Sequence, residues 1–419
     1  MTSIQHERGA ITASEGTAPP ARPARVPDLI ADEAQALDVA KRLAAEFSVD
    51  AALRDRERHL PWTELDAFVS SGLWGITVPR EYGGAGVSNG VLAEVVATIS
   101  AADGSLGQIP QNHYYALEVL RVGGTHAQRR FFYERVLAGE RFGNALAEIG
   151  QRDFKRRTRL TRGPDEWHID GQKFYCTGAL YAHWIPTLVV ADENGRDVTY
   201  LVFVPRAAQG VTVIDDWDGF GQRVTGSGSV KFERVPVQPE WVVPFQASFE
   251  RPTTIGPFAQ IIHAAIDLGQ ARGAFAAMLS FIREKSRPWI DAKVARAADD
   301  PLTIAQVGDL AVQIRAAEAL LRRAGRAVDA AQADPTERLV ADASIAVAEA
   351  RALTTTASLD AGSRLFELAG TAATLDGLGL DRFWRNARTH TLHDPVRWKY
   401  HAVGNFYLNN ALPPRHGAL

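Results

Sequence analysis

A short turn near the end of the chain carries the residues best suited to proton chemistry. The stretch Leu392-His393-Asp394-Pro395 places an imidazole, which can take up or release a proton near neutral pH, beside a carboxylate. The same Asp-Pro pair is also a sensible helix boundary, so an alternative is that His393 only caps or packs against a helix end. We favour the chemical role and take His393 and Asp394 as candidate catalytic residues.

Several other kinds of chemistry have no matching pattern in the sequence. Cys176 is the only cysteine, which excludes an intrachain disulfide and a cysteine-based metal cluster. We find no P-loop, no Gly-x-Ser-x-Gly elbow and no His/Glu metal-ligand motif, and we predict no metal. A Gly-x-Gly-x-x-Gly fingerprint after a predicted strand is also missing, so we expect no direct use of NAD(P)H.

Length and composition are those of a globular protein with two or three subdomains. The chain has 419 residues, 46% of them hydrophobic, and a formal net charge of -3, so charge predicts neither a nucleic-acid nor a membrane partner. No apolar run reaches the ~18 residues of a membrane span. Residues 1–27 lack the apolar segment of a signal peptide, and we expect a mobile tail and a cytoplasmic protein.

The elements that must position His393 fall into three successive regions. Apolar residues recur at three- and four-residue spacing over residues 32–56, from residue 62, and over 91–101, 114–122 and 125–137, which predicts a helical domain. Short β-branched and aromatic runs follow, separated by Gly, Asn, Asp or Pro, and predict an antiparallel β domain. Long alanine-rich periodic stretches then predict a helical bundle. The predicted domains are residues 28–140, 141–255 and 256–419.

This order of regions, together with local motifs, resembles the acyl-CoA dehydrogenase superfamily. Residues 78–86, Val-Pro-Arg-Glu-Tyr-Gly-Gly-Ala-Gly, are similar to a turn of that family, and residues 219–223 with the following strand are similar to its central-domain signature. The resemblance implies an α+β multidomain protein of the acyl-CoA dehydrogenase fold. Its parts would be an N-terminal helical domain, a central antiparallel β-barrel and a C-terminal four-helix bundle.

A closer resemblance is to the flavin-dependent monooxygenase branch of that superfamily, the dibenzothiophene monooxygenase type. It rests on AADGSLG at 101–107, RPW at 287–289, DPLTI at 300–304 and above all DRFWRNARTHTLHDPV at 381–396. From about residue 27 to the C-terminus, the amino-acid sequence most resembles the SfnB-type sulfur-acquisition oxidoreductases. In many dehydrogenases a glutamate base occupies the position of the LHDP turn, so its replacement by His393 favours oxygen insertion.

The resemblance implies a set of residues at the flavin ring. Asn144, in FGNALAE, and Thr177, in FYCTG together with Phe174, match positions that orient the flavin and its oxygen adduct. Trp217, in DDW, matches an aromatic residue near the ring. His113, in QNHYYAL, matches a histidine that faces the substrate. Without the resemblance, each of these would be read as an ordinary turn, strand or core residue.

The resemblance also implies how the flavin phosphate is held. Arg283, in FIREKSRPW, is similar to an arginine that reaches the phosphate from a neighbouring subunit, and Gly370-Thr371 to a phosphate-binding turn. Arginine suits this role because its guanidinium forms charge-assisted bonds to phosphate. Ala372 stands where the branch commonly has an arginine, which fits weaker holding of a diffusible flavin. We therefore expect a homo-oligomer, of the tetrameric kind usual in the family.

We predict a two-component monooxygenase that takes reduced FMN from a separate flavin reductase and uses O2 as co-substrate. It would act through a C4a-(hydro)peroxyflavin on a small organosulfur compound, a sulfone, sulfinate or sulfoxide. One alternative is an FAD-dependent acyl-CoA dehydrogenase with Glu250 as its base. A second is a catalytically silent binding protein that keeps the flavin fold.

Overall fold

A computed structural model describes residues 20–21, 26–149, 155–164 and 166–419. These residues form two compact units, which we describe separately. The β unit contains Phe142–Asp218 and Gly226–Val243, and the helical unit contains Arg22–Arg141, Gly219–Thr225 and Pro244–Leu419. The predicted tail at 1–27 lies largely outside the described residues. The two helical regions predicted at opposite ends of the sequence thus share one unit, which also takes in a short loop from the middle of the chain.

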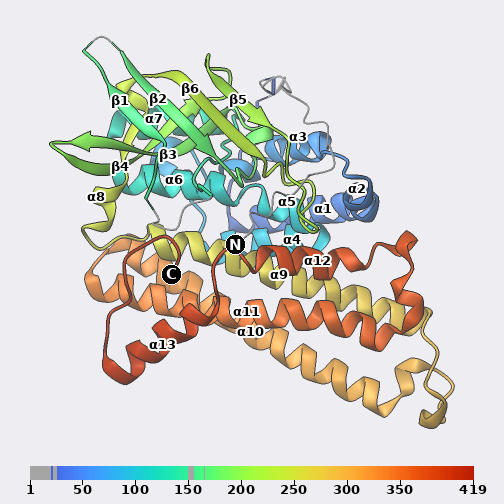
Figure 1. Ribbon diagram of the computed structural model, residues 1–419. Helices are drawn as coiled ribbons and strands as arrows, with labels where there is room; N and C mark the ends of the chain where they lie inside the picture. Colours follow the sequence, from blue (N-terminus) through green and yellow to red (C-terminus); the bar gives the residue numbers. More distant parts are fainter. Residues whose placement is uncertain (1–19, 22–25, 150–154, 165) are drawn as a thin grey trace, which may run out of the picture. The chain divides into compact units, whose positions relative to one another are not determined.

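The helical unit is built from α-helices joined by short turns and 3-10 segments (Figure 1). Its N-terminal helices are α1 (Glu33–Ser48), α2 (Ala51–Glu57), α3 (Trp62–Ser70), α4 (Asn89–Ala102), α5 (Gly104–Gln108), α6 (Gln111–Gly123) and α7 (His126–Leu137). Its C-terminal helices are α8 (Gln246–Phe249), α9 (Ile255–Glu284), α10 (Pro301–Ala333), α11 (Glu337–Ala369), α12 (Asp381–His390) and α13 (Arg397–Asn409). Its 3-10 segments are η1 (Leu73–Gly75), η2 (Arg80–Tyr82), η5 (Ile290–Ala292), η6 (Ala297–Asp299), η7 (Thr371–Thr374) and η8 (Asp376–Leu378). Among the described residues, no helix has the length and apolar character needed to cross a membrane.

The single helix predicted over residues 32–56 is two helices in the structure. Helix α1 is capped by the side chain of Asp32, which accepts from the backbone N–H of Gln35, and it ends before Val49. Helix α2 then buries Arg54, whose guanidinium bonds Asp103 and the carbonyl of Phe47. Periodicity alone missed this break because both helices bury apolar residues at helical spacing.

Helix α9 is the centre of the helical unit. It packs against α4, α6, α10, α11 and α12, and every residue from 255 to 271 is buried. Two glycines make the contact with α4 possible, because a Cβ at Gly269 would lie 2.3 Å from the carbonyl oxygen of Ala97 and one at Gly273 would lie 2.3 Å from that of Ala101. Polar side chains on this half of α9 must therefore find partners inside the protein.

The β unit is a seven-stranded sheet in the order β5-β6-β2-β1-β3-β4-β7. Its strands are β1 (Arg159–Arg162), β2 (Trp167–Lys173), β3 (Trp184–Glu193), β4 (Arg196–Pro205), β5 (Val211–Ile214), β6 (Ser229–Val237) and β7 (Val242–Pro244), with 3-10 segments η3 (Ala179–Tyr181) and η4 (Pro239–Trp241). The long β3–β4 hairpin pairs Trp184 with Pro205 and Glu193 with Arg196. Apolar side chains of both strands are buried, among them Ile185 and Val189 of β3 and Val202 and Val204 of β4.

The sheet is mixed, which corrects the predicted antiparallel arrangement. Strand β1 pairs with β3 in parallel, with Arg159 opposite Val190, and two isolated bridges from Phe142 and Ala145 to β3 are also parallel. A parallel neighbour requires a long connection, and the segment from β2 through η3 supplies it. The prediction failed here because β1 is only four residues long and was not recognised as a strand.

Candidate functional site

The LHDP turn follows directly from the end of α12. The carbonyl of His390, in the last turn of that helix, accepts the backbone N–H of His393 at 3.1 Å and its ring Nδ1–H at 2.7 Å. Because a carbonyl can only accept, Nδ1 of His393 carries the proton. In the neutral ring Nε2 is then an acceptor, and the side-chain Nε2 of Gln108 lies 3.3 Å from it. The turn therefore leaves Nε2 as the basic nitrogen of His393, next to the buried side chain of Gln108.

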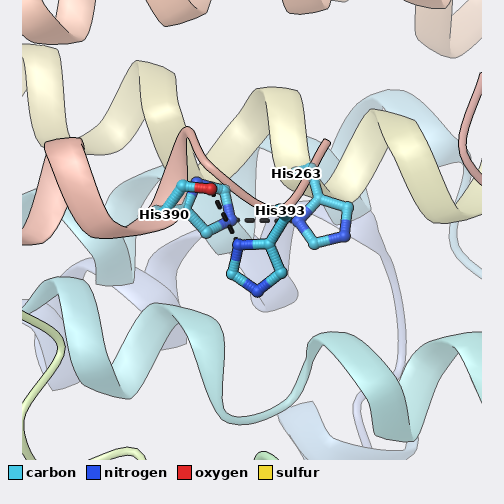
Figure 2. Close-up of side chains that lie close together, drawn as sticks. All are labelled: His263, His390 and His393. Carbon is cyan, nitrogen blue, oxygen red and sulfur yellow. Dashed lines mark hydrogen bonds between the residues drawn. The ribbon is translucent and has the colours of Figure 1, made fainter. Parts of the chain in front are cut away.

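Three imidazoles gather at this turn, one from α9 and two from the α12 end (Figure 2). We call His263, His390 and His393 the three-histidine cluster; their ring centroids lie 4.9–5.1 Å apart. Nδ1 of His263 lies 3.0 Å from Nε2 of His390. His263 and His390 are buried, whereas His393 is exposed. The cluster thus connects the interior of the helical unit to its surface.

A buried carboxylate fixes the protons of the cluster. Oδ1 of Asp267 lies 2.5 Å from Nδ1 of His390 and accepts its N–H. Nε2 of His390 therefore accepts from Nδ1–H of His263. The other oxygen, Oδ2, accepts from the hydroxyl of Thr355 at 2.9 Å and from the guanidinium of Arg351. Carboxylate, first ring and second ring form one continuous hydrogen-bonded chain.

Burial dominates the ionisation of these groups. Burial raises the pKa of Asp267 to about 6, against the opposing charge of Arg351 and the bond from Thr355. Burial also lowers the pKa of His263 and His390 well below the ordinary value, and nearby positive charge acts in the same direction. The surrounding protein likewise lowers the pKa of His393, although the bond to the His390 carbonyl opposes the shift. At neutral pH the rings are neutral and Asp267 is a carboxylate.

Asp394 is tied down on the other side of the turn. Its Oδ1 accepts from Nε2 of Gln260 at 3.0 Å, and its Oδ2 lies 3.4 Å from Nζ of Lys399 and 3.9 Å from Nε of Arg351. Lys399 is also buried, and burial lowers its pKa to about 8 even though Asp394 favours the charged form. These contacts hold Asp394 and the turn in place, and its catalytic role stays a prediction.

Four buried polar residues form a stripe along one face of α9. They were not singled out from the sequence. Gln260, His263, Asp267 and Gln270 follow at spacings of three, four and three, which places them on one face of a helix that is otherwise apolar in this half. That stripe was the available signal, since a buried helix carries polar side chains only where partners exist. His390 and Arg351 were also missed, because their partners lie more than 80 residues away along the chain.

The β unit holds the predicted ring-binding residues apart from the histidines. Asn144 and Thr177 are both buried, and Oγ1 of Thr177 lies 2.8 Å from Oγ of Ser227. Phe174 and Trp217 are half-buried. The exposed ring of Tyr175, whose φ is 55°, meets Trp217 edge-on at 6.1 Å. The FYCTG segment thus combines a buried hydroxyl pair with accessible aromatic rings.

The predicted phosphate-binding residues lie together at the far end of α9. Arg283 is exposed in its last turn, and the nearby hydroxyl of Ser286 donates to the carbonyl of Ala369, which precedes Gly370. Gly370 has φ 81°, and nothing stands within 4 Å of the position of a Cβ there. An exposed guanidinium beside an open glycine turn, with Thr371 also exposed, is a donor set that fits a phosphate.

The two ends of α9 that carry His263 and Arg283 are far apart. Arg283 lies roughly twenty residues beyond His263, which at the rise of an α-helix is about 30 Å. This is further than one FMN molecule extends. One molecule of that length therefore cannot contact both His263 and Arg283 of the same chain.

Two further predicted residues lie in less suggestive places. His113 is fully buried in α6, where Nε2 lies 3.0 Å from the carbonyl of Trp74 and the indole packs against the ring. Burial lowers its pKa to about 3. These are the surroundings of a structural histidine, and its role toward substrate stays a prediction. Glu250, the base of the alternative dehydrogenase reading, is exposed just after α8.

Comparison with known protein families identifies the class of the chain. Residues 31–140 match the acyl-CoA dehydrogenase N-terminal domain, and residues 261–398 match the acyl-CoA dehydrogenase C-terminal domain. The chain is also 34% identical to dibenzothiophene monooxygenase of Rhodococcus erythropolis over 391 residues, which cover 90% of this chain and 93% of the relative. It therefore belongs to the acyl-CoA dehydrogenase superfamily, in its flavin-dependent monooxygenase branch. The family and the fold predicted from the sequence are confirmed.

Three further proteins show which members of the branch are similar. A probable FMNH2-dependent monooxygenase, SfnC of Pseudomonas putida, is 32% identical over 90% of this chain and 96% of its own length. The crystal structure of FMN-bound TdsC from Paenibacillus sp. A11-2 matches with a TM-score of 0.88 at 33% identity, covering 92% of this chain and all of that one. Methanesulfinate monooxygenase MsuC from Pseudomonas fluorescens matches with a TM-score of 0.85 at 30% identity, covering 91% and 99%.

Proposed function

We propose that this protein is a two-component monooxygenase that receives reduced FMN from a separate flavin reductase and oxygenates a small organosulfur compound. The similarity to enzymes named for FMNH2 and for sulfur compounds over about nine-tenths of the chain supports the cofactor and the substrate class. Bound reduced FMN supplies two electrons for the activation of O2. One oxygen atom goes to the substrate and the other leaves as water.

The observation that carries this proposal is the protonation of His393. Its Nδ1–H is held by the carbonyl of His390, so in the neutral ring Nε2 is the proton acceptor, beside the side chain of Gln108. We propose that this nitrogen exchanges a proton with the reacting group, and that Asp394 holds the turn through Gln260. A carboxylate base of the dehydrogenase type is not needed for this chemistry.

Four residues of the β unit are also proposed to bind the flavin ring. We propose that Asn144 and Thr177 donate hydrogen bonds to the flavin edge, since both are buried and polar and Thr177 already shares its hydroxyl with Ser227. Phe174 and Trp217 would pack against the ring system. A site of this kind excludes water from the reacting atoms.

The phosphate end would come from a second copy of the chain. Because Arg283 lies about 30 Å along α9 from His263, we propose that Arg283 and the Gly370-Thr371 turn bind the phosphate of the flavin held by a neighbouring subunit. The enzyme would then be a homo-oligomer, tetrameric in keeping with its family, whose site is incomplete in one chain.

Rapid mixing tests the function directly. Protein with reduced FMN is mixed with oxygenated buffer, and flavin reoxidation is followed by absorbance, with methanesulfinate, a dialkyl sulfone, a dialkyl sulfoxide or dibenzothiophene present. We expect slower reoxidation than for free FMNH2, and oxygenated product from at least one sulfur compound. Reoxidation at the free rate with no product contradicts the proposal. Tightly bound FAD that is reduced by an acyl-CoA would instead establish the dehydrogenase alternative.

Replacement of His393 tests the proposed role of that residue. The variant His393→Gln should lose about 100-fold or more of the product-forming rate, the range of a removed general acid or base, and keep the thermal unfolding midpoint. His401→Gln, an exposed histidine on α13, is the matched control and should retain the wild-type rate. Equal rates for both variants would remove His393 from the mechanism.

A further inference from the structure

The three-histidine cluster has a geometry that suits a metal ion as well as a proton chain. One nitrogen of each ring can be chosen so that all three lie within 4.8 Å of one another. Neutral imidazole is a ligand for Zn²⁺ and related first-row ions. Spacing along the chain does not indicate this grouping, because His263 lies 127 residues before His390, and we predicted no metal.

The surroundings of His390 resemble the outer shell of a zinc site. Its Nδ1–H is held by the carboxylate of Asp267 while its Nε2 faces His263. A histidine that ligates zinc commonly donates its other N–H to a carboxylate, which orients the ring and raises its basicity. Arg351 and Thr355 hold that carboxylate in turn, so the ring is already oriented before an ion arrives.

The pair His263 and His390 needs little movement to accept an ion. Their facing nitrogens lie 3.0 Å apart, and two ligands at tetrahedral angles with bonds of about 2.05 Å would lie about 3.4 Å apart. The ion would replace the proton between them, and that proton would move to the other nitrogen of His263, so none is lost. His393 lies on an exposed turn, where its ring can reorient and solvent can fill a fourth position.

The charges around the cluster nearly cancel. Asp267 and Asp394 face it from α9 and the turn, while Arg351 from α11 and Lys399 from α13 oppose them. The ligands therefore have to supply the affinity, because the net field does not attract a cation.

We infer that His263, His390 and His393 form a binding site for one divalent first-row transition metal ion of the Zn²⁺ type. An ion there occupies a nitrogen of His393, so metal binding and proton exchange by His393 exclude each other. The ion would then act as a reversible inhibitor. Only this consequence rests on the proposed function; the binding does not.

Calorimetric titration of Zn²⁺ into the tag-free, chelator-treated full chain, without flavin, tests the site. We expect saturation at one ion per chain, and the visible spectrum of added Co²⁺ should report tetrahedral or five-coordinate binding. The variants His263→Gln and His393→Gln should each weaken binding at least about tenfold, and Asp267→Asn about tenfold through the outer shell. His401→Gln should bind as the wild type does.

Two controls keep the test decisive. Circular dichroism and thermal unfolding show whether His263→Gln folds, and the exposed His393→Gln gives an independent variant if it does not. Zn²⁺ should raise the unfolding midpoint of the wild type and not that of His393→Gln. The inference is overturned if the wild type shows no saturable binding, or if both cluster variants bind Zn²⁺ as tightly as His401→Gln does.

Discussion

The two ends of helix α9 use polar residues in opposite ways. In the first half, His263 and Asp267 are buried and their hydrogen bonds are made to fixed partners. In the last turn, Arg283 is exposed. Buried polar groups are costly unless they are paired, whereas an exposed cation keeps its hydration until a ligand replaces the water. One helix can therefore combine a preorganised chemical site with a binding group that is kept available for a partner.

Removing Arg351 should give the largest loss of stability. It would leave the Asp267 carboxylate buried without its cation, and the variant Arg351→Met should lose about 3–5 kcal/mol of unfolding free energy in urea. The exposed Arg338→Met, on the same helix and paired with Asp342, should lose less than about 1 kcal/mol. Equal losses would break the contrast between buried and exposed charges.

A double variant sharpens this result. In Arg351→Met with Asp267→Asn no buried charge is left unpaired, so part of the lost stability should return. If the double variant loses more unfolding free energy than the two single variants lose together, the ion pair does not account for the effect.

Substitution of the exposed Arg283 should change the binding of FMN rather than the stability of the fold. The variant Arg283→Gln should weaken FMN binding about tenfold, the value of one charge-assisted hydrogen bond, without a change in the unfolding midpoint. Equilibrium dialysis of FMN measures this. Arg326→Gln, an exposed arginine on α10, should bind FMN as the wild type does. A lowered midpoint for Arg283→Gln would show that this residue also has a structural role.

In the β unit, Thr177 and Ser227 form a buried hydrogen bond that involves no charged group. Thr177→Val removes the bond to Ser227 and should cost about 1 kcal/mol in urea unfolding, together with part of the product-forming rate. Thr177→Ser keeps the hydroxyl and should retain both. If Thr177→Val alters neither quantity, Thr177 is only a strand-end residue.

The last prediction concerns the pH dependence of stability and the carboxyl of Glu148. Burial alone would raise the pKa of this carboxyl, but bonds from Lys173, Arg157 and Thr158 outweigh it and lower the pKa below its ordinary value. Such a group stabilises the fold above its unfolded pKa, and this stability is lost as the pH falls through the lowered folded value. Urea midpoints from pH 7 to pH 3 should therefore fall in acid, and less steeply in Glu148→Gln.

That variant has a second expected consequence. Lys173 is fully buried and Glu148 is its ion-pair partner at 2.6 Å, so Glu148→Gln should also be less stable than the wild type at pH 7. A variant with the wild-type slope in acid would assign the acid sensitivity to other carboxylates.

The helices and the LHDP turn could be predicted from the sequence, because they depend on residues that are close together along the chain. Helix periodicity located α9, α10 and α11, and the LHDP turn identified His393 because its residue types stand together. The partners of His393 could not be found in this way. His263 and Asp267 meet His390, and Arg351 meets Asp267, only after three helices pack together. A single polar residue in a helix gives no indication of its partner. Strand β1 was missed for a related reason, because four residues are too few to show an alternation.

The polar stripe on α9 has a consequence for how the helical unit assembles. The close contact of Gly269 and Gly273 with α4 already restricts rotation of α9 about its own axis, and the polar residues restrict it further. A turn by one residue, about 100°, would move His263 and Asp267 away from His390 and Arg351 and leave each without its partner. The stripe therefore helps to fix the rotation of α9 about its own axis. The same angle sets the direction in which the exposed Arg283 leaves the other end of that helix.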